Sequence, residues 1–366
     1  MKPLNILNFS GGPGALPESV LLQVQQAILE VPEVGLSVLG ISHRSDWFAA
    51  VLQETEDNIR ALLGLGTDYH VLLLQGGATQ QFSMVPMTLL RGQKAPAQYI
   101  QTGYWSGKAL PEARLHGDIE VVWSGQASGY TRLPEDKELS LSANAPYLHY
   151  VSNETVEGLQ FNRVLGRDGV PRICDMSSDF LSKPCEAERF ALIYAHAQKN
   201  IGPAGVTVVL VQDALLQDAP TDLPAFLDYK QQIKAHSNLN TPPVFSIYVT
   251  LLVTRWLRHN IGGLAKMDQI NREKAALLYQ ALDDGEGFYQ GRAAAADRSL
   301  MNVVMRLPSA ELEQAFLAQS AQAGFSGLAG HRAVGGIRAS IYNALSLSAV
   351  QRLTEFMRDF RRQAQQ

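Results

Sequence analysis

The chain has few cysteines, no excess of either charge and no long apolar run. Its 366 residues include two cysteines, Cys174 and Cys185, which cannot form a disulfide framework or a metal site of the usual spacings. No stretch of about 18 consecutive apolar residues occurs, so we expect no membrane-spanning helix and no membrane partner. The formal net charge is −4 and the basic residues are dispersed, which leaves no surface pattern for nucleic acid.

Two further absences bear on the cellular setting. The first ten residues contain too short an apolar stretch for a signal peptide, and the scarcity of cysteine is typical of a reducing compartment. We therefore expect a cytoplasmic protein with no metal site. An apolar fraction of 46% and a charged fraction of 18% are ordinary for a compact enzyme, and the length predicts one large domain with a smaller companion.

Helical and strand patterns alternate through the first two-thirds of the chain. Helices are expected over 17–30, 47–63 and 79–90, and strands over 71–74, 97–101, 119–122, 147–150, 171–174, 190–195 and 206–211. This alternation predicts an α/β fold with a mostly parallel sheet between helices. Ligands of such sheets bind beyond the carboxyl ends of the strands. We therefore expect the chemistry at Gly76, Ser152, Asp175 and Lys199, each just past a strand.

The pattern becomes sparser after a long helix over 244–259 that ends near Gly262. Beyond it we expect helices over 264–282, 312–323 and from residue 347, with strands over 302–306 and 337–341. These elements predict a smaller α+β domain. The expected division is a large domain over 16–260 and a small domain made of 1–15 and 261–366.

Lys199 is the first candidate for chemistry. The apolar run Phe190–Ala195 stops at Gln198-Lys199, and a turn rich in glycine and proline leads into a second apolar run. A lysine at the end of a buried strand is partly desolvated, which lowers its pKa and frees the amine to attack an aldehyde. An enzyme that holds pyridoxal 5′-phosphate (PLP) as a Schiff base needs such an amine. Taken alone, Lys199 is better explained as a solvated turn residue, and the rest of the chain reverses that preference.

Asp175 is the candidate partner of a pyridine nitrogen because it ends a strand expected beside the one that leads to Lys199. A carboxylate at about 4 Å from a protonated ring contributes on the order of 4 kcal/mol at intermediate dielectric. That energy corresponds to roughly three pKa units in favour of the pyridinium, the form that withdraws electrons strongly. A helix N-cap is the alternative role for Asp175.

Three further segments supply the remaining parts of a PLP site. The turn Gly76-Gly77 before a helix lets backbone N–H groups approach a phosphate, although such a turn needs no ligand. Trp105 can stack on a ring or simply belong to the core. Thr155 can bond a phenolic oxygen or be an ordinary turn residue.

Several cationic residues form a second set of candidates: His43, Arg44, His331, Arg332 and Arg338. The guanidinium of arginine matches carboxylates and phosphates. Two His-Arg pairs and one further arginine therefore indicate a substrate with two anionic ends, although most arginines in proteins are simply solvated.

Together these motifs resemble those of phosphoserine aminotransferases, class V members of the fold type I PLP-dependent enzymes. The resemblance runs from Asn8 to Asn343, and its most specific stretches are 42–44, 103–105, 153–155, 198–205, 240–243 and 330–332. It implies a fold type I PLP-dependent transferase, with a large domain whose mostly parallel sheet is covered by helices and a smaller α+β C-terminal domain.

The resemblance also implies residue roles. Lys199 would form the Schiff base, Asp175 would contact the pyridine nitrogen, Trp105 would stack on the ring, and Thr155 would contact its phenolic oxygen. The PLP phosphate would be bound by Ala78, Thr79 and Gln198, with Asn240 and Thr241 coming from the second subunit of a homodimer. Arg338 would bind the substrate α-carboxylate, and the distal anion would lie among His43, Arg44, His331 and Arg332.

Two positions depart from the family pattern. Some relatives have arginine where this chain has Thr79, so the distal phosphate would depend more on His43 and Arg44. Some have serine where this chain has Gly11, which puts in doubt a glutamate contact near the N-terminus. Neither departure touches the cofactor chemistry.

The activity implied by the resemblance is reversible amino transfer between L-glutamate and 3-phosphohydroxypyruvate, which gives O-phospho-L-serine and 2-oxoglutarate in serine biosynthesis. Amination of a phosphorylated hydroxythreonine precursor in pyridoxine biosynthesis is a second implied role that the residues do not decide. A PLP-dependent lyase of the same fold, such as a cysteine desulfurase, is the alternative enzyme and would need a mobile nucleophilic cysteine. A non-catalytic phosphate-binding protein is the third reading.

Overall fold

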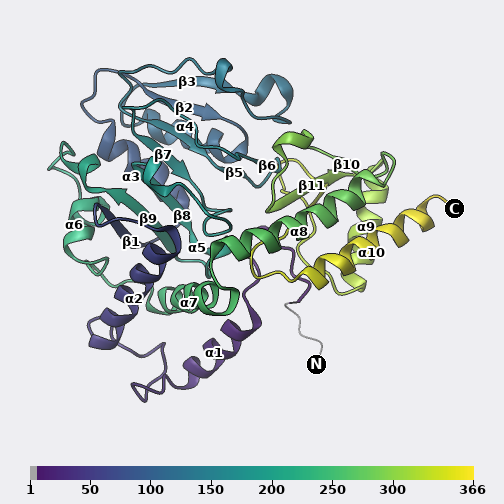
Figure 1. Cartoon of the computed structure of the whole chain (residues 1–366), viewed down its shortest axis with the longest axis horizontal. Helices are drawn as coiled ribbons and strands as arrows, with labels where there is room; N and C mark the ends of the chain where they lie inside the picture. The colour runs from purple at the N-terminus through teal and green to yellow at the C-terminus, as the bar shows by residue number, and fades with distance from the viewer. Residues whose placement is uncertain (1–5) are drawn as a thin grey trace.

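The computed structural model describes residues 6–366, which form a large unit around one sheet and a smaller C-terminal unit beside it (Figure 1). The sheet has seven strands in the order β1-β9-β8-β7-β4-β2-β3. The strands are β1 (Tyr69–Gln75), β2 (Ala97–Gln101), β3 (Ile119–Ser124), β4 (Leu148–Val151), β7 (Arg172–Asp175), β8 (Leu192–His196) and β9 (Val206–Gln212). Every neighbouring pair is parallel except those of β9, so the prediction of a mostly parallel sheet is confirmed.

The orientation of β9 follows from its short connection to β8. Only the helix α5 (Ala197–Asn200) and a turn over 201–205 separate the two strands. A parallel crossover needs about a dozen residues or more, so the chain reverses instead. As a result, Lys199 lies in a short link between two central strands.

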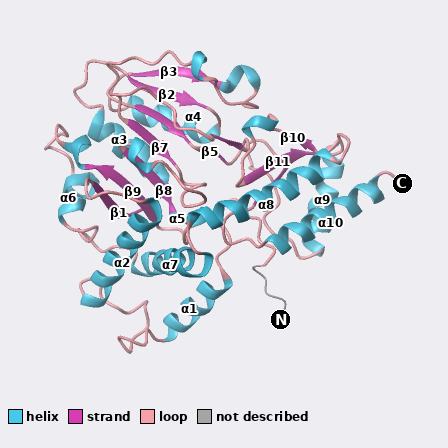
Figure 2. Cartoon of the chain, viewed as in Figure 1, coloured by secondary structure: helices cyan, strands magenta, loops and turns pink. Residues whose placement is uncertain are grey.

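Helices cover both faces of the sheet (Figure 2). The side chains of β1 alternate between two hydrophobic clusters: Val71 and Leu73 pack on one face, and Leu72 and Leu74 on the other. The first face is covered by α1 (Glu18–Leu29), α2 (Asp46–Leu63) and α7 (Val244–Arg255), and the second by α3 (Ala78–Leu89), α4 (Tyr104–Arg114) and α6 (Tyr229–Lys234). Because both faces are buried, the strands read as continuous apolar runs.

The smaller unit has its own sheet and core. Strands β10 (Gln290–Gly291), β11 (Asn302–Arg306) and β12 (Ile337–Ser340) form an antiparallel sheet with α8 (Leu264–Asp283), α9 (Ala310–Gln322) and α10 (Leu347–Ala364). Leu7 and Phe9 join its hydrophobic cluster. This packing supports our proposal that 1–15 and 261–366 form one domain. Residues 1–5 of that domain lie outside the described part of the chain.

Two elements near the site were not predicted from the sequence. The helix α4 contains Gly107 and Pro111, which lower helix propensity and hide the helical pattern. The hairpin of β5 (Asn153–Glu154) and β6 (Leu159–Gln160) is too short to show a periodicity. The helix expected over 244–259 is α7, which continues as the π-helical segment η6 (Trp256–Ile261). Within residues 6–366, no helix is long and apolar enough to cross a membrane.

Candidate active site

Asp175 and the segment that carries Lys199 lie at the carboxyl ends of adjacent parallel strands. β7 ends at Asp175, and β8 ends at His196, directly before α5. In the β7·β8 register, Asp175 pairs with Tyr194. Strand pairing therefore brings the acid and the amine to the same edge of the sheet, as the sequence predicts.

Burial disfavours the charged form of both groups. Asp175 is 4% exposed, and burial raises its pKa, an effect that the charge of Lys199 partly offsets. Burial also lowers the pKa of Lys199, while Asp175 raises it and Arg338 lowers it. The backbone N–H of Ser177 donates to Oδ1 of Asp175 at 2.8 Å and orients the carboxyl group. A lysine with a lowered pKa offers a neutral amine for nucleophilic attack or proton transfer.

Trp105 and Thr155 complete the surroundings of this amine. Nζ of Lys199 lies 5.2 Å from the centroid of the Trp105 ring. Nε1 of Trp105 donates to Oγ1 of Thr155 at 2.9 Å, which fixes the plane of the indole. The structure thus brings together three side chains that are far apart in the sequence.

Glu154 holds the helix that presents Trp105, and the sequence analysis missed it. Its carboxylate accepts hydrogen bonds from the backbone N–H groups of Trp105 at 3.0 Å and Ser106 at 2.9 Å, and from the Ser106 hydroxyl at 2.6 Å. A carboxylate at a helix N-terminus satisfies N–H groups that the helix leaves unpaired. An acid directly before the candidate Thr155, just past the apolar strand Leu148–Val151, is the signal that could have revealed this role.

The turn before α3 is fixed against the strand that follows Lys199. Gly76 has a φ of 111°, which favours glycine, and its backbone N–H donates to the carbonyl of Gly205 at 3.0 Å. The hydroxyl of Thr207 donates to the carbonyl of Gly76 at 2.9 Å. α3 then begins at Ala78 and Thr79, whose N–H groups lie in the first turn of the helix, the part that favours an anion.

The N-terminal segment crosses the link that contains Lys199. The backbone N–H of Gly14 donates to the carbonyl of Gln198 at 2.7 Å. A Cβ atom at Gly12 would lie 3.5 Å from both Nε2 of Gln198 and Cγ of Lys199. Gln198 is therefore held beside the N-terminal segment.

Arg338 and His331 reach the same region from the smaller unit. Nη1 of Arg338 lies 3.4 Å from the carbonyl oxygen of Thr155, and its buried Nε has no hydrogen-bond partner among residues 6–366. Burial lowers the pKa of Arg338. The ring of His331 lies 4.7 Å from that of Tyr104, centroid to centroid. A buried guanidinium whose N–H donors lack partners can bind a carboxylate through charge-assisted hydrogen bonds.

His43 and Arg44 lie in a different part of the chain. Nη1 of Arg44 donates to the carbonyl of Asn238 at 3.0 Å, and Nδ2 of Asn238 donates to the carbonyl of His43 at 2.9 Å. None of the contacts described for residues 6–366 joins this pair to Lys199 or Arg338. Arg332, in contrast, is exposed on the loop that carries His331.

Thr241 lies beside His43, and Asn240 lies at the end of β1. Thr241 and His43 line one cleft of about 330 Å³. Nδ2 of Asn240 donates to Oε1 of Gln75, the last residue of β1, at 3.1 Å. The predicted site residues thus fall into two groups within a single chain.

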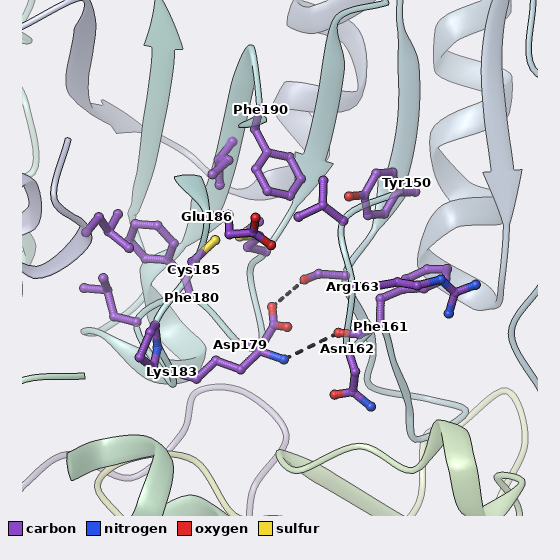
Figure 3. A pocket seen from close by; sticks show the side chains of 17 residues that line it. Tyr150, Phe161, Asn162, Arg163, Asp179, Phe180, Lys183, Cys185, Glu186 and Phe190 are labelled. Carbon is purple, nitrogen blue, oxygen red and sulfur yellow. Dashed lines mark hydrogen bonds between the residues drawn. The ribbon is translucent and has the colours of Figure 1, made fainter. Parts of the chain in front are cut away.

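The two cysteines do not offer a mobile nucleophile. Cys174 is buried in β7, and burial raises its pKa well above the usual value. Cys185 lines a second cavity of about 130 Å³ with Phe180 and Asp179 (Figure 3), and burial raises its pKa to about 12. Both thiols are therefore protonated at neutral pH and poor nucleophiles. The alternative of a cysteine desulfurase lacks the group that it needs.

Comparison with known proteins agrees with this geometry. Residues 6–353 match the family model described as aminotransferase class-V. A phosphoserine aminotransferase of Desulfosudis oleivorans is 49% identical over 358 residues, which are 98% of this chain and 98% of the relative.

Solved structures give the same result. The phosphoserine aminotransferase of Bacillus circulans subsp. alkalophilus superimposes with a TM-score of 0.94 at 46% identity, covering 97% of this chain and 98% of the other. The PLP-bound phosphoserine aminotransferase of Trichomonas vaginalis superimposes with a TM-score of 0.90 at 33% identity, covering 96% and 99%. The predicted fold type is thereby confirmed.

Proposed function

The chain belongs to the aminotransferase class-V family, and from this premise we propose that it transfers the amino group between L-glutamate and 3-phosphohydroxypyruvate. It is a PLP-dependent aminotransferase, and its products are 2-oxoglutarate and O-phospho-L-serine. One observation carries the proposal: the Lys199 amine lies against the face of Trp105, with Asp175 at the end of the neighbouring strand. An amine, an aromatic face and a buried acid are what a pyridine aldehyde requires.

The residues around Lys199 fit PLP chemically. The first turn of α3 offers N–H groups to a phosphate, and the buried Asp175 needs a cationic partner to lower its raised pKa. The residues that would hold the cofactor are Ala78, Thr79, Trp105, Thr155, Asp175, Gln198 and Lys199, with Asn240 and Thr241 from a second copy of the chain. When bound, PLP supplies an electron sink for the charge that develops at the substrate Cα.

The protein groups control protons and water around this chemistry. Asp175, as a carboxylate, would hold a proton at the pyridine nitrogen of bound PLP. Nζ of Lys199, whose pKa burial lowers, would remove the proton from Cα of glutamate and later return one to Cα of the product. Trp105 is fixed by Glu154 and Thr155, and it would cover one face of the PLP ring and exclude water from it.

Arg338 and the histidine-arginine pairs account for a substrate with two anionic ends. Arg338 would bind the α-carboxylate that both substrates share, through its unused buried donors. His331, Arg332, His43 and Arg44 would bind the γ-carboxylate of glutamate or the phosphate of the keto acid. Both groups are anions at a similar distance from Cα.

A homodimer with shared sites would unite the two groups of residues. His43, Arg44, Asn240 and Thr241 lie together, apart from Lys199, so we propose that they complete the site of the partner subunit. Sedimentation of the PLP-loaded enzyme should give twice the mass of one chain. An active monomer would contradict this arrangement. We also propose a cytoplasmic location and a role in serine biosynthesis.

A coupled assay tests the activity. Purified enzyme with PLP is supplied with glutamate and 3-phosphohydroxypyruvate, and the 2-oxoglutarate formed is measured. Pyruvate and oxaloacetate, which lack the phosphate, serve as controls. We expect kcat/KM to be highest for the phosphorylated acid, by about tenfold or more, because its distal anion is bound by several cations. Equal turnover of all three keto acids would refute the substrate assignment.

A further inference from the structure

Two buried carboxyl groups meet the first turn of α4. Glu154 ends β5 and is 1% exposed, and Glu157 lies in the following turn and is 2% exposed. The carboxylate of Glu154 accepts four hydrogen bonds, from Trp105 N–H, Ser106 N–H, the Ser106 hydroxyl and the Thr102 hydroxyl. Burial raises the pKa of Glu154, and its four donors oppose that effect because they favour the ionised form.

Glu157 is much less well satisfied. Its Oε1 accepts one hydrogen bond, from the backbone N–H of Tyr104 at 3.1 Å, and its buried Oε2 has no partner in the described part of the chain. A Cβ atom at Gly103 would lie 2.4 Å from this Oε2, so the oxygen is pressed against the backbone that enters α4. A second buried negative charge is unfavourable here because Glu154 already occupies the helix terminus.

The charges that face Glu157 come from four elements. Glu154 of β5 and the Tyr130 phenol are negative when ionised, whereas Arg292, after β10, and Arg338 of β12 are positive. Burial and, after it, the charge of Glu154 raise the pKa of Glu157 to about 8, against the smaller effects of the Tyr104 N–H and of Arg292. Of the two acids, Glu157 therefore carries the proton at neutral pH.

The turn held by this pair presents two side chains to the site. Tyr104 contacts the ring of His331, and Trp105 contacts Lys199 and Thr155. We propose that Glu157 is a positioning residue: as the neutral acid beside ionised Glu154, it fixes the Tyr104–Trp105 turn, and loss of its proton loosens that turn and weakens substrate binding. The statement about the substrate rests on the proposed function, whereas the statement about the turn does not.

Stability of the apoprotein tests the turn. We compare the wild type with Glu157→Gln, whose amide has the shape of the neutral acid. The folded wild type keeps the Glu157 proton up to about pH 8, while the unfolded chain releases it near pH 4.3, so wild-type stability falls between these values. We expect the Tm of Glu157→Gln to rise relative to that of the wild type from about pH 5 to pH 8 and then to level off.

A matched control lies on the same helix. Glu112 of α4 accepts a hydrogen bond from the Ser83 hydroxyl and is far from the first turn. Glu112→Gln makes the same change of charge, and its Tm difference from the wild type should stay flat over this pH range. A flat or shrinking difference for Glu157→Gln, or a Glu157→Gln protein that is unfolded at pH 5, would overturn the proposal.

The second arm measures steady-state kinetics of the PLP-loaded enzyme. Between about pH 7 and pH 9 we expect KM for 3-phosphohydroxypyruvate to rise about threefold or more in the wild type relative to Glu157→Gln, with kcat changing in parallel in the two proteins. Groups common to both proteins cancel in this ratio. If KM changes with pH in the same way in the wild type and in Glu157→Gln, the proposed effect of Glu157 on substrate binding is overturned. Absence of turnover with this keto acid would instead refute the proposed function and leave the stability result standing.

Discussion

The guanidinium of Arg338 occupies the space that a side chain at Gly11 would fill. A Cβ atom built on Gly11 would lie 2.3 Å from Nη2 of Arg338 and 2.5 Å from its Cζ. Gly11 is therefore the residue that allows Arg338 to extend toward Thr155. The absence of a side chain at Gly11 makes room for the arginine.

Replacing Gly11 should displace this arginine. We expect Gly11→Ala to raise KM for glutamate and for 3-phosphohydroxypyruvate by about threefold to tenfold each, because both substrates carry an α-carboxylate. Gly40→Ala, where the added Cβ meets nothing closer than 3.6 Å, is the control. A rise in KM for the phosphorylated substrate alone would show that Arg338 contacts the phosphate and not the shared α-carboxylate.

Removing the amine of Lys199 should abolish turnover. We expect Lys199→Ala to lower kcat by about a thousandfold or more, because the group that transfers the Cα proton is lost. Borohydride reduction of the PLP-loaded wild type, followed by peptide mapping, should place a pyridoxyl group on the peptide that contains Lys199. The exposed Lys94→Ala should behave like the wild type. Full turnover by Lys199→Ala would rule out the assigned role.

Asp175→Asn should separate stability from activity. Burial raises the pKa of Asp175, so the folded apoprotein binds this proton more tightly than the unfolded chain does. Its contribution to stability is complete below about pH 4 and is lost as the pH rises. Asparagine does not titrate, so the apo variant should gain Tm relative to the wild type as the pH rises above about 4, while kcat falls about a thousandfold. Calorimetry and steady-state assays measure the two effects, and unchanged kcat would argue against the pyridine contact.

Thr155→Val should leave the indole of Trp105 without its acceptor. Valine keeps the shape of threonine but cannot accept the hydrogen bond from Nε1, which measures 2.9 Å. We expect the free energy of unfolding of the apoprotein to fall by about 1 kcal/mol, measured by urea denaturation. Thr155→Ser retains the hydroxyl and should lose less. If serine and valine lose equally, the hydrogen bond is not the cause.

Lys274 fixes the loop after β12, and its removal should destabilise the fold. Its buried ammonium donates to the carbonyls of Ile341 at 3.0 Å, Tyr342 at 2.8 Å and Leu345 at 3.0 Å. Lys274→Met would leave these acceptors unpaired, and we expect a loss of about 3 kcal/mol in urea denaturation. Lys266→Met, exposed on the same helix, should change stability by less than about 0.5 kcal/mol. A loss of similar size in both variants would indicate a general effect on α8.

The sequence predicts best those parts of the site that depend on strand ends. Asp175 and Lys199 follow apolar runs whose neighbours in a parallel sheet can be anticipated, so their proximity is predictable. Glu154 and Glu157 could not be recognised in the same way. They lie in a short hairpin and turn, and their role depends on meeting α4, whose own pattern is hidden by Gly107 and Pro111.

The cationic residues show a different limit of sequence reasoning. His43-Arg44 and His331-Arg332 have the same local pattern, yet only the second pair lies on the loop that reaches Tyr104 and Trp105. Whether a His-Arg pair lies at the site of its own chain or at that of a partner subunit depends on tertiary packing and on the assembly of chains. Neither is encoded in local spacing.

The segment over residues 7–14 has a practical consequence for handling this protein. Phe9 hydrogen-bonds to Ser326 and Ser340 of the smaller unit, and Gly14 hydrogen-bonds to Gln198, next to Lys199. Residues 7–14 therefore connect the link that contains Lys199 to the smaller unit. A bulky tag fused before them would disturb both contacts. The end of α10 lies at the outer edge of the smaller unit, away from the seven-stranded sheet (Figure 1), which makes the carboxyl terminus the better place for purification handles or immobilisation.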